Sequence, residues 1–324
     1  MSFSIEKLPG TAFLSFPQMK ELLESELKSR LNCNLSNVKS YGDLIYMDDY
    51  DLKSLTSEFV PYWARTVFCE PFLLHFDSIG DAATALKQIQ RLWAPYQFQL
   101  FRRASLLQEK LPYINLKEKT FPYEIKSSPV GCYTLLDEHT ILASAKTSSP
   151  LPCGSLNFVE DHENPPSRAY LKIQESLCLA HYFFDVPFPS ENQRCFEAGA
   201  CPGGWTWVLA NLGADVFAVD RSELVPSLMN HPRVKFMAHD AFTLKCEDLG
   251  EFDWIFSDVI CYPERLLEWV KMWIESGRCK RFICTIKMQG EINWAIVKQF
   301  EEIPSSKVVH FNYNKHELTF IHVE

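Results

Sequence analysis

A glycine-rich segment in the second half of the chain has the composition of a ligand-binding turn. The segment CFEAGACPGGWTWVLA, residues 195–210, begins as an apolar strand and ends as an aromatic helix. Between them lie three glycines and a proline: Gly199, Pro202, Gly203 and Gly204. A tight turn needs one glycine, so this number predicts that something comes close to the backbone. Exposed N–H groups at the start of the following helix would favour an anionic ligand.

The spacing of these glycines differs from two common phosphate-binding turns. The pattern is G-x-x-x-G-G, whereas dinucleotide-binding folds use G-x-G-x-x-G and P-loops continue into Gly-Lys-Ser/Thr. A nicotinamide-dependent oxidoreductase, which the fold alone would allow, is therefore disfavoured. The turn suits a ligand that carries a carboxylate, or simply a close approach of the backbone.

Acidic residues end the next two strand-like segments. DVFAVD ends in Asp220, about 20 residues beyond the turn, where a carboxylate can accept hydrogen bonds from two ribose hydroxyls. The next segment ends at Asp240, and Phe242 follows in the range of an adenine ring. Acids commonly end strands in this kind of fold without binding anything. Three such features at successive strand ends nevertheless favour an adenosine-containing ligand.

The elements that would position these residues alternate between helices and strands. Helical spacing covers residues 168–183, 203–213, 264–277 and 293–303. Short apolar strands are expected at residues 194–200, 215–220, 235–240, 253–258, 281–287, 307–313 and 317–323. This order predicts an α/β, Rossmann-like doubly wound domain, mostly parallel, with its ligand at the carboxyl ends of the strands. The last two strands are candidates for an antiparallel edge.

The first half of the chain is predicted to be a smaller α+β domain. Strands are expected at residues 10–16, 43–48 and 66–76, and helices at residues 16–31 and 81–93. Units of this size are typical of ferredoxin-like modules. A proline-rich polar stretch at residues 149–170 predicts the boundary, which gives domains of residues 1–155 and 156–324.

Composition sets further limits on function. The 324 residues carry a formal net charge of -9, so any contact with nucleic acid must come from local basic patches. The 11 cysteines form no CxxC pair, which predicts reduced thiols without a zinc site or a disulfide framework. No metal is expected. With no signal-like start and no long apolar run, the expectation is a cytoplasmic protein without membrane contact.

Several motifs together resemble a known family. EAGACPGGWTWVL, VD at 219–220, SDVICYP, CTIKM and HELTFIHV are similar to the FtsJ-type RNA ribose 2′-O-methyltransferases, and PPSRAYLKIQES matches their leading helix. The nearest subgroup is the RlmM-type 23S rRNA cytidine 2′-O-methyltransferases, which place a ferredoxin-like and THUMP-type RNA-binding region ahead of the catalytic domain. The resemblance covers residues 165–324, and over the first 155 residues it is looser.

The resemblance implies a cofactor and a catalytic set. The cofactor is S-adenosyl-L-methionine, and the substrate is RNA rather than DNA. The Lys-Asp-Lys-Glu catalytic set falls on Lys172, Asp258, Lys287 and Glu317. The implied cofactor contacts are Glu197, Gly199, Ala200, Cys201, Pro202, Gly203, Gly204, Trp205, Asp220, Asp240, Ala241 and Asp258. Independently of the family, Asp258 and Lys287 follow or end predicted strands at the ligand-binding edge of the sheet, although any one of these charges could be a solvated surface group.

The chemistry explains why two lysines and two acids would be useful. A ribose 2′-hydroxyl is a poor acid, and a lysine can act as its base only if the lysine pKa falls well below about 10.4. We assign Lys287 as the base and Lys172 as a cation that lowers the Lys287 pKa and holds the hydroxyl or its phosphate. Asp258 would orient the amines, and Glu317 would position Lys172 or the ribose.

The sequence departs from the family at two places. Glu197 stands where the family usually has Asp, a longer acid that keeps the charge. MQGEINW follows Lys287 where basic residues would be expected, so another RNA such as tRNA is an alternative to 23S rRNA. A non-catalytic RNA-binding or ribosome-assembly factor with this fold is a second alternative, disfavoured because none of the four catalytic positions is lost.

Two basic groups are candidates for contact with RNA. The first, in the N-terminal domain, comprises Arg91, Arg102, Arg103, Lys110, Lys117, Lys119 and Lys126, interleaved with the aromatic residues Phe101, Tyr113, Phe121 and Tyr123. The second comprises Arg278, Lys280 and Arg281, which could grip phosphates or could be the cations usual at a helix C-terminus. A solvated surface over ordinary core aromatics is the alternative for the first group.

Overall fold

The computed structural model describes residues 2–324, which divide into two compact units. One unit comprises the chain up to Lys119 together with Ile125–Asn157, and the other comprises Thr120–Glu124 and Phe158–Glu324. The short segment Thr120–Glu124 therefore belongs to the second unit although the residues on both sides of it belong to the first. Each unit has its own sheets, so each is described by itself.

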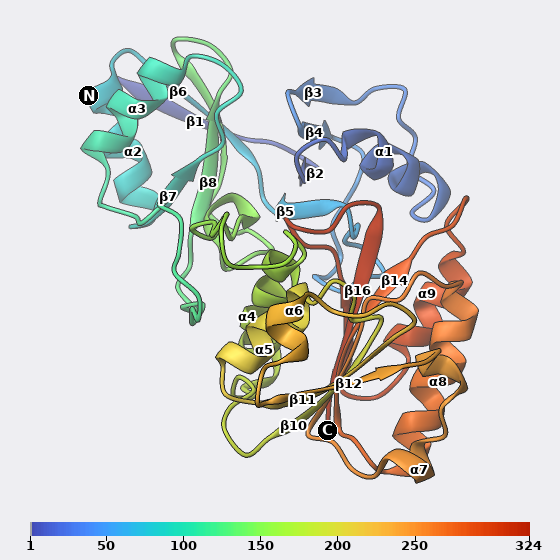
Figure 1. Cartoon of the computed structure of the whole chain (residues 1–324). Coiled ribbons are helices and arrows are strands. Elements are labelled where there is room, and N and C mark those ends of the chain that lie inside the picture. The colour runs from blue at the N-terminus through green and yellow to red at the C-terminus, as the bar shows by residue number, and fades with distance from the viewer. Residues whose placement is uncertain (1) are drawn as a thin grey trace. The chain divides into compact units, whose positions relative to one another are not determined.

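The first unit is built from two sheets (Figure 1). The five-stranded sheet has the order β1-β6-β9-β8-β7, and the four-stranded sheet has the order β3-β4-β2-β5. Its strands are β1 (Phe3–Lys7), β2 (Thr11–Ser15), β3 (Lys39–Tyr41), β4 (Leu44–Met47), β5 (Ala64–Phe68), β6 (Phe72–Phe76), β7 (Trp93–Pro95), β8 (Gly131–Leu135) and β9 (Thr140–Ser144). Its helices are α1 (Lys20–Ser29), α2 (Ile79–Ile89), α3 (Phe101–Lys110) and the 3₁₀ turn η1 (Pro152–Gly154).

The prediction of one strand over residues 66–76 is wrong. The chain instead forms β5 and β6, and these two strands lie in different sheets. Pro71 lies between them, and a proline cannot donate a hydrogen bond to a strand ladder. Apolar composition alone therefore could not show that the segment changes sheets here.

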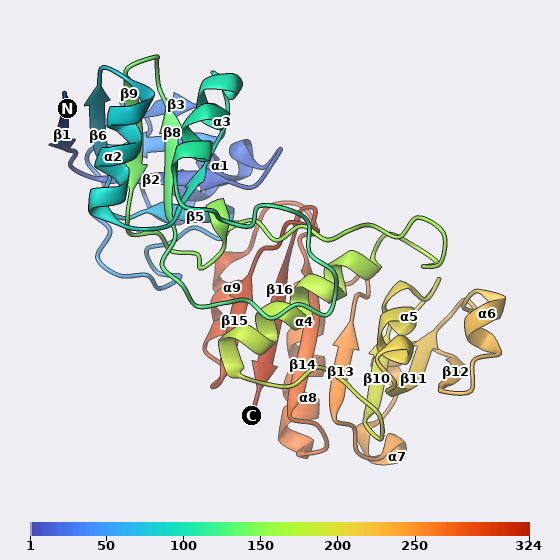
Figure 2. The ribbon, with the colours of Figure 1, turned by 90° about the vertical axis from the view of Figure 1, so that its left-hand side faces the viewer.

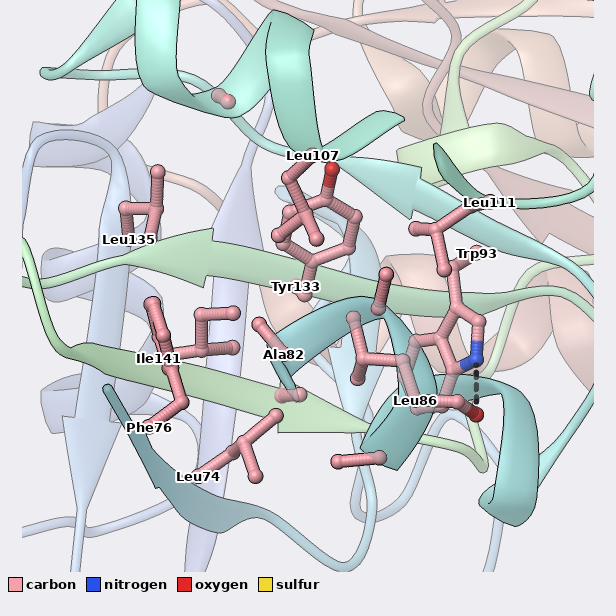
Figure 3. Close-up of a cluster of buried hydrophobic side chains, with 14 of the residues drawn as sticks. Leu74, Phe76, Ala82, Leu86, Trp93, Leu107, Leu111, Tyr133, Leu135 and Ile141 are labelled. Carbon is pink, nitrogen blue, oxygen red and sulfur yellow. Dashed lines mark hydrogen bonds between the residues drawn. The ribbon is translucent and has the colours of Figure 1, made fainter. Parts of the chain in front are cut away.

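Helices α2 and α3 cover one face of the five-stranded sheet, and Figure 3 shows the core between them. Trp93 and Tyr133 are fully buried there among aliphatic side chains such as Leu86 and Leu107. The Trp93 indole donates a hydrogen bond from Nε1 to the Leu86 carbonyl oxygen at 2.9 Å, so its one polar atom is satisfied. The other face of this sheet packs on the four-stranded sheet through residues such as Cys132 and Leu14.

The second unit is a seven-stranded sheet with helices on both faces, as predicted for a doubly wound fold. Its strands are β10 (Arg194–Ala198), β11 (Asp215–Asp220), β12 (Val234–Ala238), β13 (Trp254–Ser257), β14 (Arg281–Lys287), β15 (Ser306–Val309) and β16 (Glu317–Val323). Its helices are α4 (Tyr170–Phe184), α5 (Gly204–Asn211), α6 (Pro226–Met229), α7 (Cys246–Leu249), α8 (Pro263–Ser276) and α9 (Trp294–Glu301), with the 3₁₀ turn η2 (Ala241–Thr243).

Strand order brings the ends of non-consecutive strands together. The order is β12-β11-β10-β13-β14-β16-β15, which can be followed across the sheet in Figure 2. β10 to β14 pair in parallel, whereas β16 runs antiparallel between β14 and β15. Figure 1 shows α4 and α5 against one face of the sheet and α8 and α9 against the other. Because β16 is antiparallel, its first residue lies at the same edge as the last residue of β14.

Strand β15 ends earlier than the sequence pattern predicts. It stops at Val309, and the chain from His310 to Tyr313 leaves the sheet. The reason is a buried acid on α4, described below, which takes the backbone N–H groups of this segment. Within residues 2–324, no helix combines the length and the apolarity needed to cross a bilayer.

Candidate functional site

Four charged residues from four elements meet at one edge of the second unit. Lys172 lies in the first turn of α4, Asp258 directly follows β13, and Lys287 is the last residue of β14. Glu317 begins β16 and is paired across the ladder with Lys287. The structure thus brings all four positions of the implied catalytic set together, and we call them the tetrad.

The tetrad is a closed arrangement of alternating charges. Lys172 Nζ lies 3.2 Å and 3.4 Å from the two oxygens of Asp258 and also contacts Glu317 Oε1. Lys287 Nζ lies 2.6 Å from Asp258 Oδ1 and 3.8 Å from Glu317 Oε2. Each lysine therefore faces both carboxylates, and two positive charges balance two negative ones. Buried charge is tolerated only when it is paired in this way.

Burial differs between the two lysines. The Lys172 side chain is 8% exposed, whereas that of Lys287 is 18% exposed. Burial acts to lower the Lys172 pKa, but Asp258 and Glu317 outweigh it, so the Lys172 pKa is raised and this residue stays an ammonium. Burial acts to raise the Asp258 pKa, but Lys172 and Lys287 outweigh it, so that pKa is lowered. Lys172 is thus a fixed cation, and Lys287 is the lysine that solvent reaches more easily.

A second layer behind the tetrad holds Glu317, and the sequence analysis missed it. The carbonyl oxygen of Glu317 accepts hydrogen bonds from His310 Nδ1 at 2.9 Å and from Asn314 Nδ2 at 3.2 Å. Asn314 also donates to Thr319 Oγ1 at 3.0 Å. Burial lowers the His310 pKa to about 3, so His310 adds no positive charge to the site. These residues follow no recognisable spacing, since the loop geometry alone makes them neighbours.

Glu175, one helical turn after Lys172, anchors the same loop. It is fully buried and accepts hydrogen bonds from Asn312 N at 3.1 Å, Asn312 Nδ2 at 2.8 Å and Tyr313 N at 3.1 Å. Burial raises the Glu175 pKa to about 7 although these three donors oppose the change. The first two turns of α4 therefore hold this part of the chain at two points: Glu175 binds the connection between β15 and β16, and Lys172 contacts Glu317 at the start of β16.

Packing within the protein explains why the turn contains glycine at these positions. Gly199 has a φ of +78°, and a Cβ there would lie 2.7 Å from Val259 Cγ2. Gly203 has a φ of +115°, and its Cβ would meet Leu228 at 2.3 Å. A Cβ on Gly204 would lie 2.5 Å from the hydroxyl of Ser167. What approaches this backbone so closely is the protein itself, so the number of glycines is not by itself evidence of a ligand.

The two acids at the strand ends are already engaged by the protein. Asp220 accepts hydrogen bonds from Cys201 N and Ser222 N, both at 3.0 Å. A carboxylate offers about four lone-pair positions, so two remain for ribose hydroxyls. Asp240 accepts from Phe242 N at 3.0 Å and pairs with two arginines, Arg221 at 2.7 Å and Arg265 at 3.3 Å. These hydrogen bonds and charges outweigh desolvation and lower the Asp240 pKa.

Other predicted contacts differ in what they can offer a ligand. The Trp205 side chain is buried, and its indole donates to the Ala169 carbonyl oxygen at 3.0 Å, so only its backbone is available. Ala200 and Ala241 are also buried. Cys201 is exposed, and Pro202 lies beside it in the turn.

Glu197 does not keep its charge as expected. It is buried on β10, where the Thr206 hydroxyl donates to Glu197 Oε2 at 2.6 Å. Burial raises the Glu197 pKa to about 8, because one hydroxyl donor does not replace the lost water. A pKa raised in this way favours the neutral carboxyl over the carboxylate at pH 7. A cationic group such as a ligand ammonium would favour the ionised form.

The second basic group of the sequence analysis lies far from the tetrad. Arg281 begins β14 and Lys287 ends it, so the strand separates them by about 20 Å. Arg278 and Lys280 lie between the end of α8 and this strand. They cannot hold a phosphate beside Lys287, and the interpretation as cations near a helix C-terminus remains.

Cysteines and possible metal ligands add nothing to this site. All eleven cysteines are free thiols. In the described part of the chain, no group of three or more His, Cys, Asp or Glu side chains could hold a metal ion.

Comparisons with known proteins match the second unit. The family model described as FtsJ-like methyltransferase matches residues 165–308. "Ribosomal RNA large subunit methyltransferase M" of Aggregatibacter aphrophilus (strain NJ8700) is 33% identical over 135 residues, which are 41% of this chain and 37% of that protein. The protein of the same name from Xylella fastidiosa (strain 9a5c) is 29% identical over 171 residues, 49% of this chain and 46% of that protein.

These matches confirm the resemblance to FtsJ-type and RlmM-type proteins over the matched segment. The chain spans less than half of the length of the curated relatives that it matches. Among solved structures, a putative ribosomal RNA methyltransferase from Plasmodium falciparum gives a TM-score of 0.35 at 16% identity, covering 49% of this chain and 97% of that one. That likeness is too weak to bear on function.

The raised Glu197 pKa predicts a pH-dependent effect of Glu197→Gln. Between pH 4.5 and 8 the unfolded chain loses this proton while the folded chain keeps it, so stability falls as pH rises. Gln has the shape of the protonated acid but does not titrate, so the variant should not lose this stability as pH rises. We expect the variant to be more stable than the wild type by about 1–3 kcal/mol at pH 8, and nearly equal at pH 5.

Calorimetric unfolding of the ligand-free protein at several pH values measures this difference. The exposed Glu275→Gln is the control and should show no such trend. A stability difference for Glu197→Gln that does not change with pH would mean that Glu197 is ionised in the folded protein.

The contacts of Glu175 predict a local effect of Glu175→Gln. An amide has one oxygen, so one of the N–H groups of Asn312 and Tyr313 would face an NH₂ group instead of an acceptor. We expect amide hydrogen exchange at these two positions to accelerate about 10-fold at pH 8, without a change in β14. Unaltered protection at residues 312–313 would show that Glu175 does not hold the loop.

Proposed function

We propose that residues 165–308, the segment that matches the FtsJ-like methyltransferase model, and the strand that follows them form an S-adenosyl-L-methionine-dependent RNA ribose 2′-O-methyltransferase. The observation that carries this proposal is the tetrad, two lysines and two carboxylates paired at the carboxyl edge of a doubly wound sheet. The substrate is large-subunit (23S) rRNA, in keeping with the names of the relatives.

The residues beside the tetrad fit the cofactor. Asp220 keeps lone pairs for ribose hydroxyls, and the turn from Gly199 to Gly204 leads into the N-terminus of α5. Glu197 would pair with the ammonium of the methionine part, and Asp240 and Ala241 would meet the adenine. Arg221 and Arg265 are exposed, so they can move from Asp240. When bound, S-adenosyl-L-methionine supplies a methyl carbon already activated by its sulfonium charge.

The tetrad would supply alignment and a better nucleophile. Lys287 Nζ, the more exposed amine, takes the proton of the 2′-hydroxyl, and Asp258 Oδ1 at 2.6 Å orients that amine. Lys172 remains charged and stabilises the developing alkoxide. Glu317 holds Lys172 from the opposite side. As the general base, Lys287 acts in its neutral amine form and becomes the ammonium when it accepts the proton.

RNA recognition would use the first unit. The set of residues that contacts RNA would be smaller than the set that the sequence predicted. Phe121 belongs to the second unit and packs edge-on against Phe158 and Phe188, so it is not part of a docking face of the first unit. The remaining face lies on α3 and the loop after it. It exposes Phe101, Arg102, Leu106, Lys110, Tyr113, Leu116 and Lys117. Alternating cations and aromatics of this kind bind backbone phosphates and unpaired bases.

The proton-transfer assignment predicts the effect of Lys287→Ala. Transfer of labelled methyl groups to unmodified 23S rRNA should fall at least about 100-fold, because a general base of this type contributes that much or more. Binding of S-adenosyl-L-methionine, followed by calorimetry, should be retained, with NAD giving no heat. The exposed Lys298→Ala on α9 is the matched control.

Each result of that experiment has a distinct meaning. Full methyl transfer by Lys287→Ala would remove Lys287 as the base. Failure of the wild type to bind S-adenosyl-L-methionine would overturn the proposed function and favour a non-catalytic RNA-binding or assembly role.

The surface on α3 predicts a salt-dependent loss of RNA affinity. Replacing Arg102 and Lys110 together with Ala should weaken RNA binding and lower the slope of log affinity against log salt concentration by about 2, one for each lost phosphate contact. Lys28→Ala, an exposed lysine on α1, is the control. These substitutions are preferable to removing residues 1–150, because such a truncation would also delete Thr120–Glu124 from the second unit. An unchanged salt slope would exclude this face.

A further inference from the structure

The loop after Asp258 presents two large apolar side chains to solvent. Ile260 is 80% exposed and Tyr262 is 64% exposed. Among the large hydrophobic side chains of residues 2–324, none is more exposed than Ile260. Both lie within four residues of Asp258, so the chain keeps them within about 14 Å of the tetrad.

The loop does not need these two side chains for its own packing. Neighbouring residues of the loop pack against the protein instead. Val259 fills the space left by Gly199, and Cys261 and Pro263 are buried. Tyr262 caps α8 through its backbone, whose carbonyl oxygen accepts from Leu266 N at 3.2 Å. In the described residues, the Tyr262 ring and hydroxyl make no ring contact and no hydrogen bond. The two side chains lie two residues apart in one loop, and exposed apolar groups that form a contiguous patch commonly mark a binding site.

We propose that Tyr262, with Ile260 beside it, is the stacking surface for the base of the target nucleotide. This inference rests on the proposed function and adds the class of substrate, a nucleotide whose base is unstacked, in a single-stranded or looped segment of RNA. In a regular RNA helix the base is stacked between its neighbours and cannot lie on a protein ring. A ring that the chain keeps within about 14 Å of the tetrad would hold the base while the attached ribose meets Lys287. Stacking of this kind tolerates any base, so it selects conformation rather than sequence.

The test measures RNA binding and methyl transfer separately, with the full chain. Two fluorescein-labelled RNA probes are used, an unstructured 12-nucleotide strand and the same strand in a duplex, and binding is followed by anisotropy. We expect the wild type to prefer the single strand. Tyr262→Ala should lose about 5- to 100-fold in affinity for the single strand and little for the duplex, whereas Tyr262→Phe, which keeps the ring, should bind as the wild type does.

Controls separate this role from a loss of folding or of the cofactor site. Tyr262 is exposed, so the thermal unfolding of Tyr262→Ala and its calorimetric affinity for S-adenosyl-L-methionine should match the wild type. Leu55→Ala, another exposed apolar residue, in the first unit, should change neither RNA affinity nor methyl transfer. In methyl transfer to 23S rRNA, Tyr262→Ala should have a raised KM for the RNA. Its rate should return to the wild-type rate when the RNA is saturating.

Three results would overturn the inference. They are equal binding of the single strand by Tyr262→Ala and the wild type, an equal loss on single strand and duplex, and a shift from dimer to monomer in sedimentation with RNA affinity unchanged. The last would make the patch an interface between copies of the chain. If Tyr262-dependent binding is found but the wild type transfers no methyl group, the proposed function fails while the stacking surface stands.

Discussion

The second unit depends on the pairing of four charges at the edge of an apolar sheet. An unpaired ammonium or carboxylate in that position would cost several kcal/mol, so no member of the tetrad can be removed without leaving its partners uncompensated. This requirement constrains the backbone as well. Helix α4, the ends of β13 and β14 and the start of β16 must meet within a few ångströms, because their side chains join at 2.6–3.8 Å. A site built on regular elements in this way holds its groups more precisely than one built on loops.

Buried acids near the tetrad divide into two kinds. Asp258 has two ammonium partners, and its pKa is lowered. Glu175 and Glu197 have only neutral donors, and burial raises their pKa values to about 7 and about 8. The difference follows from what each acid faces, since a full charge offsets the loss of water better than a hydroxyl or an amide does. Groups with raised pKa values can change their charge when a cationic ligand arrives, whereas the tetrad is already balanced before any ligand is present.

The glycine-rich turn illustrates two uses of one pattern. Positive φ at Gly199 and Gly203 requires glycine, and each missing Cβ makes room for a neighbouring side chain. That packing brings the loop after β13 against the end of β10. The consequence for function is indirect but specific, because the contact between Gly199 and Val259 fixes the loop that carries Asp258 at one end and Tyr262 at the other. The same turn that could bind a ligand therefore also forms the packing contact between the ends of β10 and β13.

The sequence by itself determined the seven strands of the second unit, its helices α4, α5, α8 and α9, the doubly wound fold and the four candidate positions of the tetrad, but not the short helices α6 and α7. The fold could be predicted because short apolar strands and amphipathic helices have strong local periodicity. The four tetrad positions were implied by the motifs that resemble the FtsJ-type family. Only the tertiary structure decided that residues 66–76 split between two sheets and that Thr120–Glu124 joins the second unit. It also decided that His310 and Asn314 hold Glu317 and that Glu175 anchors the preceding loop. The contact of Glu175 with Asn312 joins residues 137 positions apart, and no local sequence pattern records a contact of that range. The raised pKa of Glu197 also could not be predicted from the sequence, because burial causes it and burial is a property of the folded chain.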